Sequence, residues 1–304
     1  MNKRMACRPT ADRLLELART ENAALIKQGI HPHLAVVLVG ENPASKVYVS
    51  NKVKTCESLG IRSTFTRMSG DTDTDALLAI VQQLNNDPEV HGILVQLPLP
   101  KGVDESQIIS AINPDKDVDG FHPVNVGRLS LGEPGLFPCT PMGVMALLED
   151  SGIDLKGKNA VVIGRSNIVG KPMAQMLLAS HATVTIIHSR TVNPHEICRN
   201  ADIVIAAVGV PGLVDGSWLK EGAVVVDVGM NSLTDPEQVA RFVKEGSRKH
   251  KAFLKNGQVL YGDVFYDHAL EVASLVSPVP GGVGKLTIAQ LMVNCVTAAR
   301  RSAS

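Results

Sequence analysis

Residues 159–170 read Asn-Ala-Val-Val-Ile-Gly-Arg-Ser-Asn-Ile-Val-Gly, which is the pattern of an apolar strand, a turn and the start of a helix. Gly164 allows a sharp turn, and Gly170 lets the following helix approach the sheet closely. Backbone N–H groups at the start of that helix would face an anion, with help from the helix dipole. The spacing is not G-x-G-x-x-G, so an ordinary strand–turn–helix remains an alternative to a dinucleotide site.

Short apolar strands alternate with amphipathic helices on both sides of this turn. The alternation predicts parallel sheets that helices cover on both faces. We therefore expect an α/β protein with two α/β domains around a cleft, the second a Rossmann-like dinucleotide-binding domain. The predicted strands are 34–39, 93–97, 159–163, 183–187, 203–207 and 223–228, and the predicted helices include 10–28, 44–59, 73–86, 104–112 and 285–300.

Proline and glycine crowd residues 113–140, and this predicts a loop-rich crossing between the domains. We expect the first domain to contain residues 1–139 and 278–304, and the second to contain residues 140–277. Residues 234–256 are charged and helix-prone, so we interpret them as a solvated excursion from the surface.

The composition argues against several classes of protein. Among 304 residues, Lys plus Arg and Asp plus Glu both number 30, so no net charge recruits nucleic acid or an anionic membrane. Aromatic residues make up only 3%, and no apolar run is long enough to span a bilayer. Five cysteines without a C-x-x-C pair, and no apparent leader, predict reduced thiols in a cytoplasmic protein. Metal-ligand spacing is absent, so we expect no bound metal.

The end of the second strand after the Gly164 turn indicates which nucleotide would bind. An NAD site places an acid there, but residues 188–191 read His-Ser-Arg-Thr. Arg190, Arg165 and the Ser189 hydroxyl suit a 2′-phosphate, which favours NADP. A glycine-rich segment at 281–285 lacks the residues that a P-loop requires on either side, so we reject ATP binding there.

Four polar side chains are candidates for chemistry. Tyr48 and Lys52 stand one helical turn apart, so a phenol and an amine share one face. An amine in a site that excludes water releases its proton more readily, although two amphipathic residues on a surface give the same spacing. Gln96 is the one polar residue in an apolar strand end, and it either binds a ligand or satisfies a neighbour. Asp119 closes an acidic turn that lacks the final Glu of a calcium loop.

Together these segments resemble one family, the bifunctional methylenetetrahydrofolate dehydrogenase/methenyltetrahydrofolate cyclohydrolases of one-carbon metabolism. The resemblance extends from about residue 34 to residue 294. Its motifs are Ser45-Lys46-Val47-Tyr48 with Lys52, Gln96-Leu97-Pro98-Leu99-Pro100, Lys116-Asp117-Val118-Asp119-Gly120, Pro138-Cys139-Thr140-Pro141, Gly164-Arg165-Ser166 and Pro278-Val279-Pro280-Gly281-Gly282-Val283-Gly284.

The resemblance implies two reactions, NADP-dependent oxidation of 5,10-methylenetetrahydrofolate and hydrolysis of the product to 10-formyltetrahydrofolate. It implies that Lys52 manages protons, that Tyr48 orients Lys52 and stacks on the pterin, that Gln96 tunes Lys52, and that Asp119 grips the pterin. The first domain would bind the folate, and the protein would be a homodimer formed through the nucleotide domain. The implied folate-binding residues also include Val95, Leu97, Pro278, Val279, Pro280, Gly281 and Gly282, and the implied cofactor-binding residues are Gly164, Arg165, Ser166, Ser189 and Met230.

Two other interpretations fit parts of the sequence. A short-chain dehydrogenase also uses Tyr-x-x-x-Lys, but its glycine-rich loop precedes that pair, whereas Gly164 follows Lys52. A folate- or nucleotide-binding regulatory protein could keep the pocket without turnover. The chain departs from the family at Lys285-Leu286, where Pro-Met is usual, in the opening residues 1–9, and in the apparent insertion at 234–256.

Overall fold

The computed structural model of the chain describes residues 3–303, apart from the side chains of Pro43 and Ala44. Two compact units divide the chain, and each has its own parallel sheet. The three-stranded unit contains residues 11–142 and those from 287 onward, and the five-stranded unit contains residues 143–286 and those up to residue 10. The predicted α/β fold with parallel sheets and a Rossmann-like half is confirmed.

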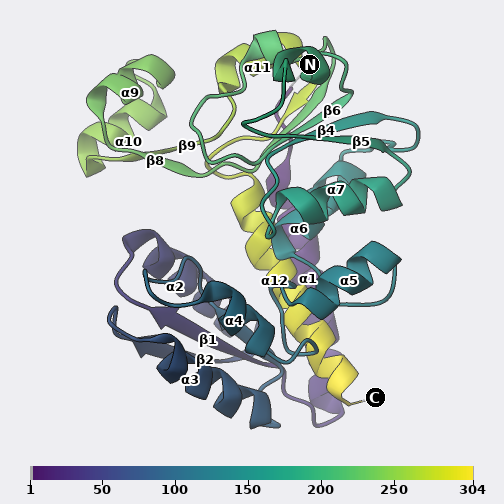
Figure 1. The fold of residues 1–304 in the computed structure, drawn as a ribbon, viewed down its shortest axis with the longest axis vertical. Helices are drawn as coiled ribbons and strands as arrows, with labels where there is room; N and C mark the ends of the chain where they lie inside the picture. Colours follow the sequence, from purple (N-terminus) through teal and green to yellow (C-terminus); the bar gives the residue numbers. More distant parts are fainter. Residues whose placement is uncertain (1–2, 304) are drawn as a thin grey trace. The chain divides into compact units, whose positions relative to one another are not determined.

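The three-stranded unit is built around β1 (His33–Val39), which lies between β2 (Arg62–Met68) and β3 (Gly92–Val95). All seven residues of β1 are buried, as expected for a central parallel strand that is covered on both faces. One apolar cluster joins β1 to α1 (Cys7–Lys27), α2 (Pro43–Leu59) and α12 (Val283–Ser302), and a second joins it to α3 (Thr74–Asn86) and α4 (Glu105–Ala111). Arg300 of α12 pairs with Glu21 of α1 at 3.0 Å where the two helices run together (Figure 1).

The five-stranded unit has the strand order β10-β7-β6-β4-β5, and every pairing is parallel. Its strands are β4 (Asn159–Ile163), β5 (Thr183–Ile187), β6 (Ile203–Ala206), β7 (Val224–Asp227) and β10 (Leu275–Val276). Its helices include the greater part of α6 (Cys139–Asp150), α7 (Gly170–Ala179), α8 (Pro194–Cys198), the 3₁₀ turn η1 (Gly216–Trp218) and α11 (Tyr266–Val272). Because parallel strands end at one edge, the loops after β4, β5, β6 and β7 gather there.

The charged segment after β7 is folded rather than irregular. An antiparallel pair, β8 (Asn231–Leu233) and β9 (Val259–Tyr261), brackets two short helices, α9 (Pro236–Phe242) and α10 (Arg248–Asn256), as Figure 1 shows. A small apolar cluster that includes Leu233, Val239 and Tyr261 holds these elements together. The segment therefore has a small apolar core of its own, whereas the sequence predicted only a solvated excursion from the surface.

Three features differ from the sequence-based prediction. The edge strand β2 was not predicted, because its side chains are mostly exposed and polar. Within the predicted loop 113–140 lies α5 (Pro123–Leu131), which His122 caps at the start and Gly132 ends at φ +71°. Residues 3–10 belong with the five-stranded unit, since the Met5 amide donates to the Val276 carbonyl at 2.9 Å. Across residues 3–303, no helix has both the length and the apolar character to cross a membrane.

Candidate active site

The Tyr48 and Lys52 side chains come from α2, and Lys52 reaches Gln96, the residue that follows β3. Lys52 is only 5% exposed, and its Nζ donates to Gln96 Oε1 at 3.0 Å. Gln96 Nε2 donates to the Leu97 carbonyl at 2.7 Å, so the amide is held with its oxygen toward the lysine. Tyr48 is half-buried, and burial raises the pKa of its phenol. The structure thus brings Lys52 and Gln96 into direct contact, which the resemblance to the family had implied.

Asp119 lies near this pair in the same unit. Burial raises the pKa of the Asp119 carboxyl, whereas the charge of Lys52 lowers it and that of Asp117 raises it further. The Ile93 amide of β3 donates to the Lys116 carbonyl at 2.8 Å, so the loop that carries Asp119 lies beside the strand that ends next to Gln96. A buried amine, an amide that orients it and a carboxyl therefore share one site on the three-stranded unit.

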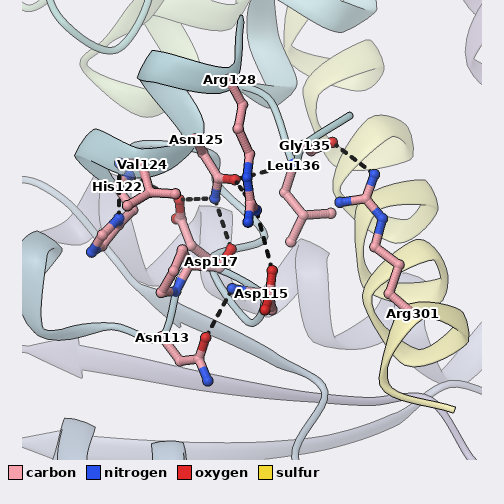
Figure 2. Close-up of polar contacts among 11 residues, drawn as sticks. Asn113, Asp115, Asp117, His122, Val124, Asn125, Arg128, Gly135, Leu136 and Arg301 are labelled. Carbon is pink, nitrogen blue, oxygen red and sulfur yellow. Dashed lines mark hydrogen bonds and ion pairs between the residues drawn. The ribbon is translucent and has the colours of Figure 1, made fainter. Parts of the chain in front are cut away.

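A network of hydrogen bonds fixes the loop that carries Asp119 (Figure 2). The buried carboxylate of Asp117 accepts from the Gly120 amide at 3.1 Å, the His122 amide at 2.8 Å and Asn125 Nδ2 at 3.0 Å. Asn125, on α5, also donates to the Pro114 carbonyl at 2.8 Å. The loop is thus closed on itself and tied to a helix, which leaves Asp119 little freedom to move.

The other side of the same loop is tied to α12. Asn294 Nδ2 donates to the carbonyls of Val118 and Phe137, both at 2.9 Å, and the Cys139 thiol donates to Val118 at 3.2 Å. The sequence does not mark Asn294 or Asn125 as a site residue. In the sequence each is only a polar amide residue in an otherwise apolar helical stretch. Such a pattern predicts a buried hydrogen bond but does not identify the partner.

The predicted nucleotide turn is present at the end of β4. Gly164 has φ +115°, and a Cβ there would lie 2.1 Å from the Ala207 carbonyl oxygen. A Cβ on Gly170 would lie 2.3 Å from the Gly164 carbonyl oxygen, so both positions require glycine. Ser166 Oγ accepts from the Val169 and Gly170 amides, each at 3.2 Å, at the start of α7. The strand–turn–helix thus has the tight geometry of a phosphate-binding turn.

The groups that surround this turn suit a nucleotide with an additional phosphate. The Gly164 amide donates to the Ile187 carbonyl at 2.8 Å, which places the turn beside the end of β5. Arg165, Ser189 and Arg190 are exposed, and no carboxylate follows β5 within residues 188–191. Within the described part of the chain, neither guanidinium forms an ion pair. Free guanidinium groups without a competing acid match phosphate oxygens, so these residues fit NADP.

The remaining predicted residues are divided between the two units. Val95 and Leu97 flank Gln96 in the three-stranded unit, whereas the loop 278–282 and Met230 lie in the five-stranded unit. A Cβ on Gly282 would lie 2.1 Å from the Pro278 carbonyl oxygen, so the loop is tightly wound. Met230 follows β7 and is 40% exposed, which leaves its side chain accessible to a ligand.

Known proteins share both halves of this arrangement. Residues 5–119 match the family model described as tetrahydrofolate dehydrogenase/cyclohydrolase, catalytic domain, and residues 138–303 match its NAD(P)-binding domain. The chain belongs to the tetrahydrofolate dehydrogenase/cyclohydrolase family. The predicted family, its two enzymatic activities and its nicotinamide nucleotide cofactor are therefore confirmed.

Similar proteins agree with this assignment over nearly the whole chain. The bifunctional protein FolD of Moorella thermoacetica is 54% identical over 93% of this chain and 93% of its own length. The crystal structure of the bifunctional FolD enzyme from Campylobacter jejuni has a TM-score of 0.86 at 43% identity and covers 97% of both chains. The Trypanosoma brucei enzyme, solved with NADP cofactor and inhibitor, has a TM-score of 0.88 at 37% identity and covers 99% of this chain and 98% of its own.

Proposed function

We propose that this chain oxidises 5,10-methylenetetrahydrofolate to 5,10-methenyltetrahydrofolate with NADP and then hydrolyses that product to 10-formyltetrahydrofolate. The observation that supports the residue roles best is the contact between the buried Lys52 amine and the Gln96 carbonyl oxygen. An amine that is withdrawn from water and held by one fixed acceptor is suited to transfer protons.

Lys52 serves both steps because each changes the protonation or charge of the folate. In the oxidation, a hydride leaves the bridging methylene carbon and the folate becomes a cation. In the hydrolysis, water adds to that carbon and releases one proton. The bond from the carbon to one ring nitrogen then breaks, that nitrogen gains a proton, and the new hydroxyl loses its proton as it becomes the formyl oxygen. Lys52 would move these protons, and Gln96 would hold its amine at the reacting carbon.

Tyr48 and Asp119 would place the substrate. The Tyr48 ring offers an apolar face to the pterin, while its position one turn from Lys52 helps to orient the amine. Asp119 would accept hydrogen bonds from the amino edge of the pterin, a role that its hydrogen-bonded loop supports. Val95 and Leu97 would line the folate-binding surface.

The cofactor would bind at the carboxyl ends of the strands of the five-stranded sheet. Gly164, Arg165 and Ser166 would hold its phosphates at the start of α7, and Ser189 and Arg190 would hold the 2′-phosphate. Met230 would contact it from the end of β7. When bound there, NADP supplies the hydride acceptor for the oxidation.

A coupled assay with purified protein tests the proposal. NADPH absorbance should rise when 5,10-methylenetetrahydrofolate and NADP are present, and methenyltetrahydrofolate absorbance should decay faster with the protein than without it. Folate and NADP binding without turnover in either assay would instead favour the regulatory protein considered above.

We also propose that the protein is a cytoplasmic homodimer formed through its nucleotide-binding domain. All five cysteines are buried and unpaired, which agrees with a reducing compartment. Light scattering during gel filtration should report twice the mass of one 32.4 kDa chain, and a monomeric mass would contradict the dimer.

A further inference from the structure

Two carboxylates lie inside the five-stranded unit and have no role in the chemistry described so far. Asp227 is the last residue of β7 and is 2% exposed, and Asp263, just after β9, is 0% exposed. Buried carboxylates destabilise a protein unless donors surround them. Their hydrogen-bond partners therefore indicate what the two groups hold in place.

Asp263 connects the loops that follow β6 and β7. Its Oδ2 accepts from the Val208 amide at 2.7 Å and the Gly209 amide at 2.9 Å, in the loop after β6. Its Oδ1 accepts from Asn231 Nδ2 at 2.9 Å, directly after Met230. One carboxylate thus fixes two loops from adjacent strands.

Asp227 extends the same connection to β10. Its Oδ1 accepts from the Gly229 and Asp263 amides, both at 2.9 Å, and its own amide donates to Ser277 Oγ at 2.8 Å. Ser277 follows β10 and leads directly into the loop 278–282. The two carboxylates, which we call the aspartate hub, therefore join the ends of β6, β7 and β10.

The packing around the aspartate hub leaves no room for adjustment. A Cβ on Gly262 would lie 1.7 Å from Asp227 Oδ2, and a Cβ on Gly229 would lie 2.3 Å from Asp263 Oδ1. Burial raises the pKa of Asp227 to about 7, and the charge of Asp263 adds to the effect. Burial lowers the pKa of Lys249 on α10, and the charge of Asp227 partly opposes this effect.

Open α/β sheets bind their ligands beyond the carboxyl ends of the strands, where the aspartate hub lies. We infer that Asp227 and Asp263 are positioning residues for NADP, which hold the loops 208–209 and 229–231 in the shape that receives the nucleotide. The inference rests on the proposed function. It assigns the hub no contact with the reacting atoms.

The variant Asp263→Ala tests the inference by direct measurement of NADP affinity. It leaves the Val208 and Gly209 amides without their acceptor, so we expect the Kd for NADP, measured by calorimetry, to rise roughly tenfold or more. Asp263→Asn should restore most of the affinity. The oxygen of the new side chain can accept from the Val208 and Gly209 amides, and its nitrogen can donate to the Asn231 side-chain oxygen once the Asn231 amide has flipped. Asn231 is partly exposed, and Asn231→Ala removes only its hydrogen bond to Asp263, beside Met230. This variant should raise the Kd for NADP roughly two- to fivefold.

A matched control separates positioning from general loss of stability. Asp202 also ties strands together, since its Oδ2 accepts from the Asn159 amide at 3.0 Å, but it does so at the opposite edge of the sheet. Asp202→Ala should leave the Kd for NADP within twofold of the unmodified protein. Methenyltetrahydrofolate hydrolysis needs no nucleotide, so Asp263→Ala should lower it much less than it lowers NADP affinity.

The outcomes distinguish this inference from the proposed function. An unchanged Kd for NADP in both Asp263→Ala and Asn231→Ala would overturn the inferred role of the aspartate hub in NADP binding, whatever the enzymatic activity. If Asp263→Ala does not fold, Asn231→Ala decides the question alone. An unmodified protein that binds NADP but turns over no folate would refute the proposed function and still allow the hub to be tested.

Discussion

At the scale of single residues, the site depends on groups whose orientation is fixed before any ligand arrives. Gln96 makes two hydrogen bonds in opposite directions, which settles which end of its amide faces Lys52. The sequence indicated Gln96 as a polar residue in an apolar strand end and left open whether a ligand or a neighbour satisfies it. The neighbour is Lys52. The resemblance to the family implied this pairing, whereas the residue pattern alone could not show it, because the two positions are 44 residues apart.

Gln96→Ala should disable the chemistry and leave cofactor binding intact. Loss of a hydrogen bond to a buried amine costs about 1.5–3 kcal/mol, so kcat for both steps should fall roughly tenfold to hundredfold. The Kd for NADP should not change, because the cofactor residues belong to the other unit. Steady-state kinetics and calorimetry on the same preparation check both halves, and a kcat that stays within twofold would contradict the role of Gln96.

At the scale of elements, the long, periodic segments were predictable and the capped or exposed ones were not. β1 follows from its apolar pattern, α2 from a stretch without internal proline or glycine, and the Gly164 turn from its strand and helix neighbours. In contrast, α5 was hidden among prolines and glycines, because Pro123 begins that helix instead of breaking it. The loop that carries Asp119 was recognised by its acids, but the amides that hold it come from α5 and α12.

Gly120→Ala should displace the loop that carries Asp119. Gly120 has φ +73°, and an added Cβ would lie 2.3 Å from the Phe137 carbonyl carbon, so we expect a loss of roughly 3 kcal/mol or more. Gly132→Ala is a matched control, because its φ is +71° but nothing lies within 4 Å of its added Cβ. That variant should cost only about 1 kcal/mol. Urea unfolding compares the two, and equal losses would show that close packing at Gly120 is unimportant.

The three-stranded sheet should lose stability in mild acid. His33 Nδ1 donates to the Glu89 carbonyl at 3.1 Å, which leaves Nε2 to accept from the Thr64 hydroxyl at 3.2 Å in a neutral ring. Burial lowers the pKa of His33, and burial followed by the charge of His33 lowers the pKa of His91.

Because both folded-state values lie below the ordinary value of 6.5, the unfolded chain binds more protons as pH falls. The contribution of these two histidines to the free energy of unfolding should therefore be complete above pH 6.5 and decline as pH drops below it. The raised pKa of Asp227 acts in the opposite direction, so urea titrations of the unmodified protein and of His91→Gln are compared at each pH. The unmodified protein should lose more stability on acidification than His91→Gln, and an equal pH dependence of the two proteins would contradict the neutral histidine pair.

At the scale of the whole molecule, each of the two parallel sheets carries a different set of candidate site residues. The three-stranded unit holds Lys52, Gln96 and Asp119, and the five-stranded unit holds the nucleotide turn and the aspartate hub. The family could be recognised from ordered motifs, because each is a local run of residues. Residues 3–10 could not be assigned to their unit in this way, since a single bridge to β10 leaves no periodic pattern.

The most direct test of the account is Lys52→Met, which keeps the length of the side chain and removes the amine. We expect methenyltetrahydrofolate hydrolysis to collapse while the Kd for NADP stays unchanged. Lys54→Met, at an exposed position on the same helix, should keep full activity as the control. If Lys52→Met hydrolyses methenyltetrahydrofolate at the rate of the unmodified protein, the central role given to this amine is wrong.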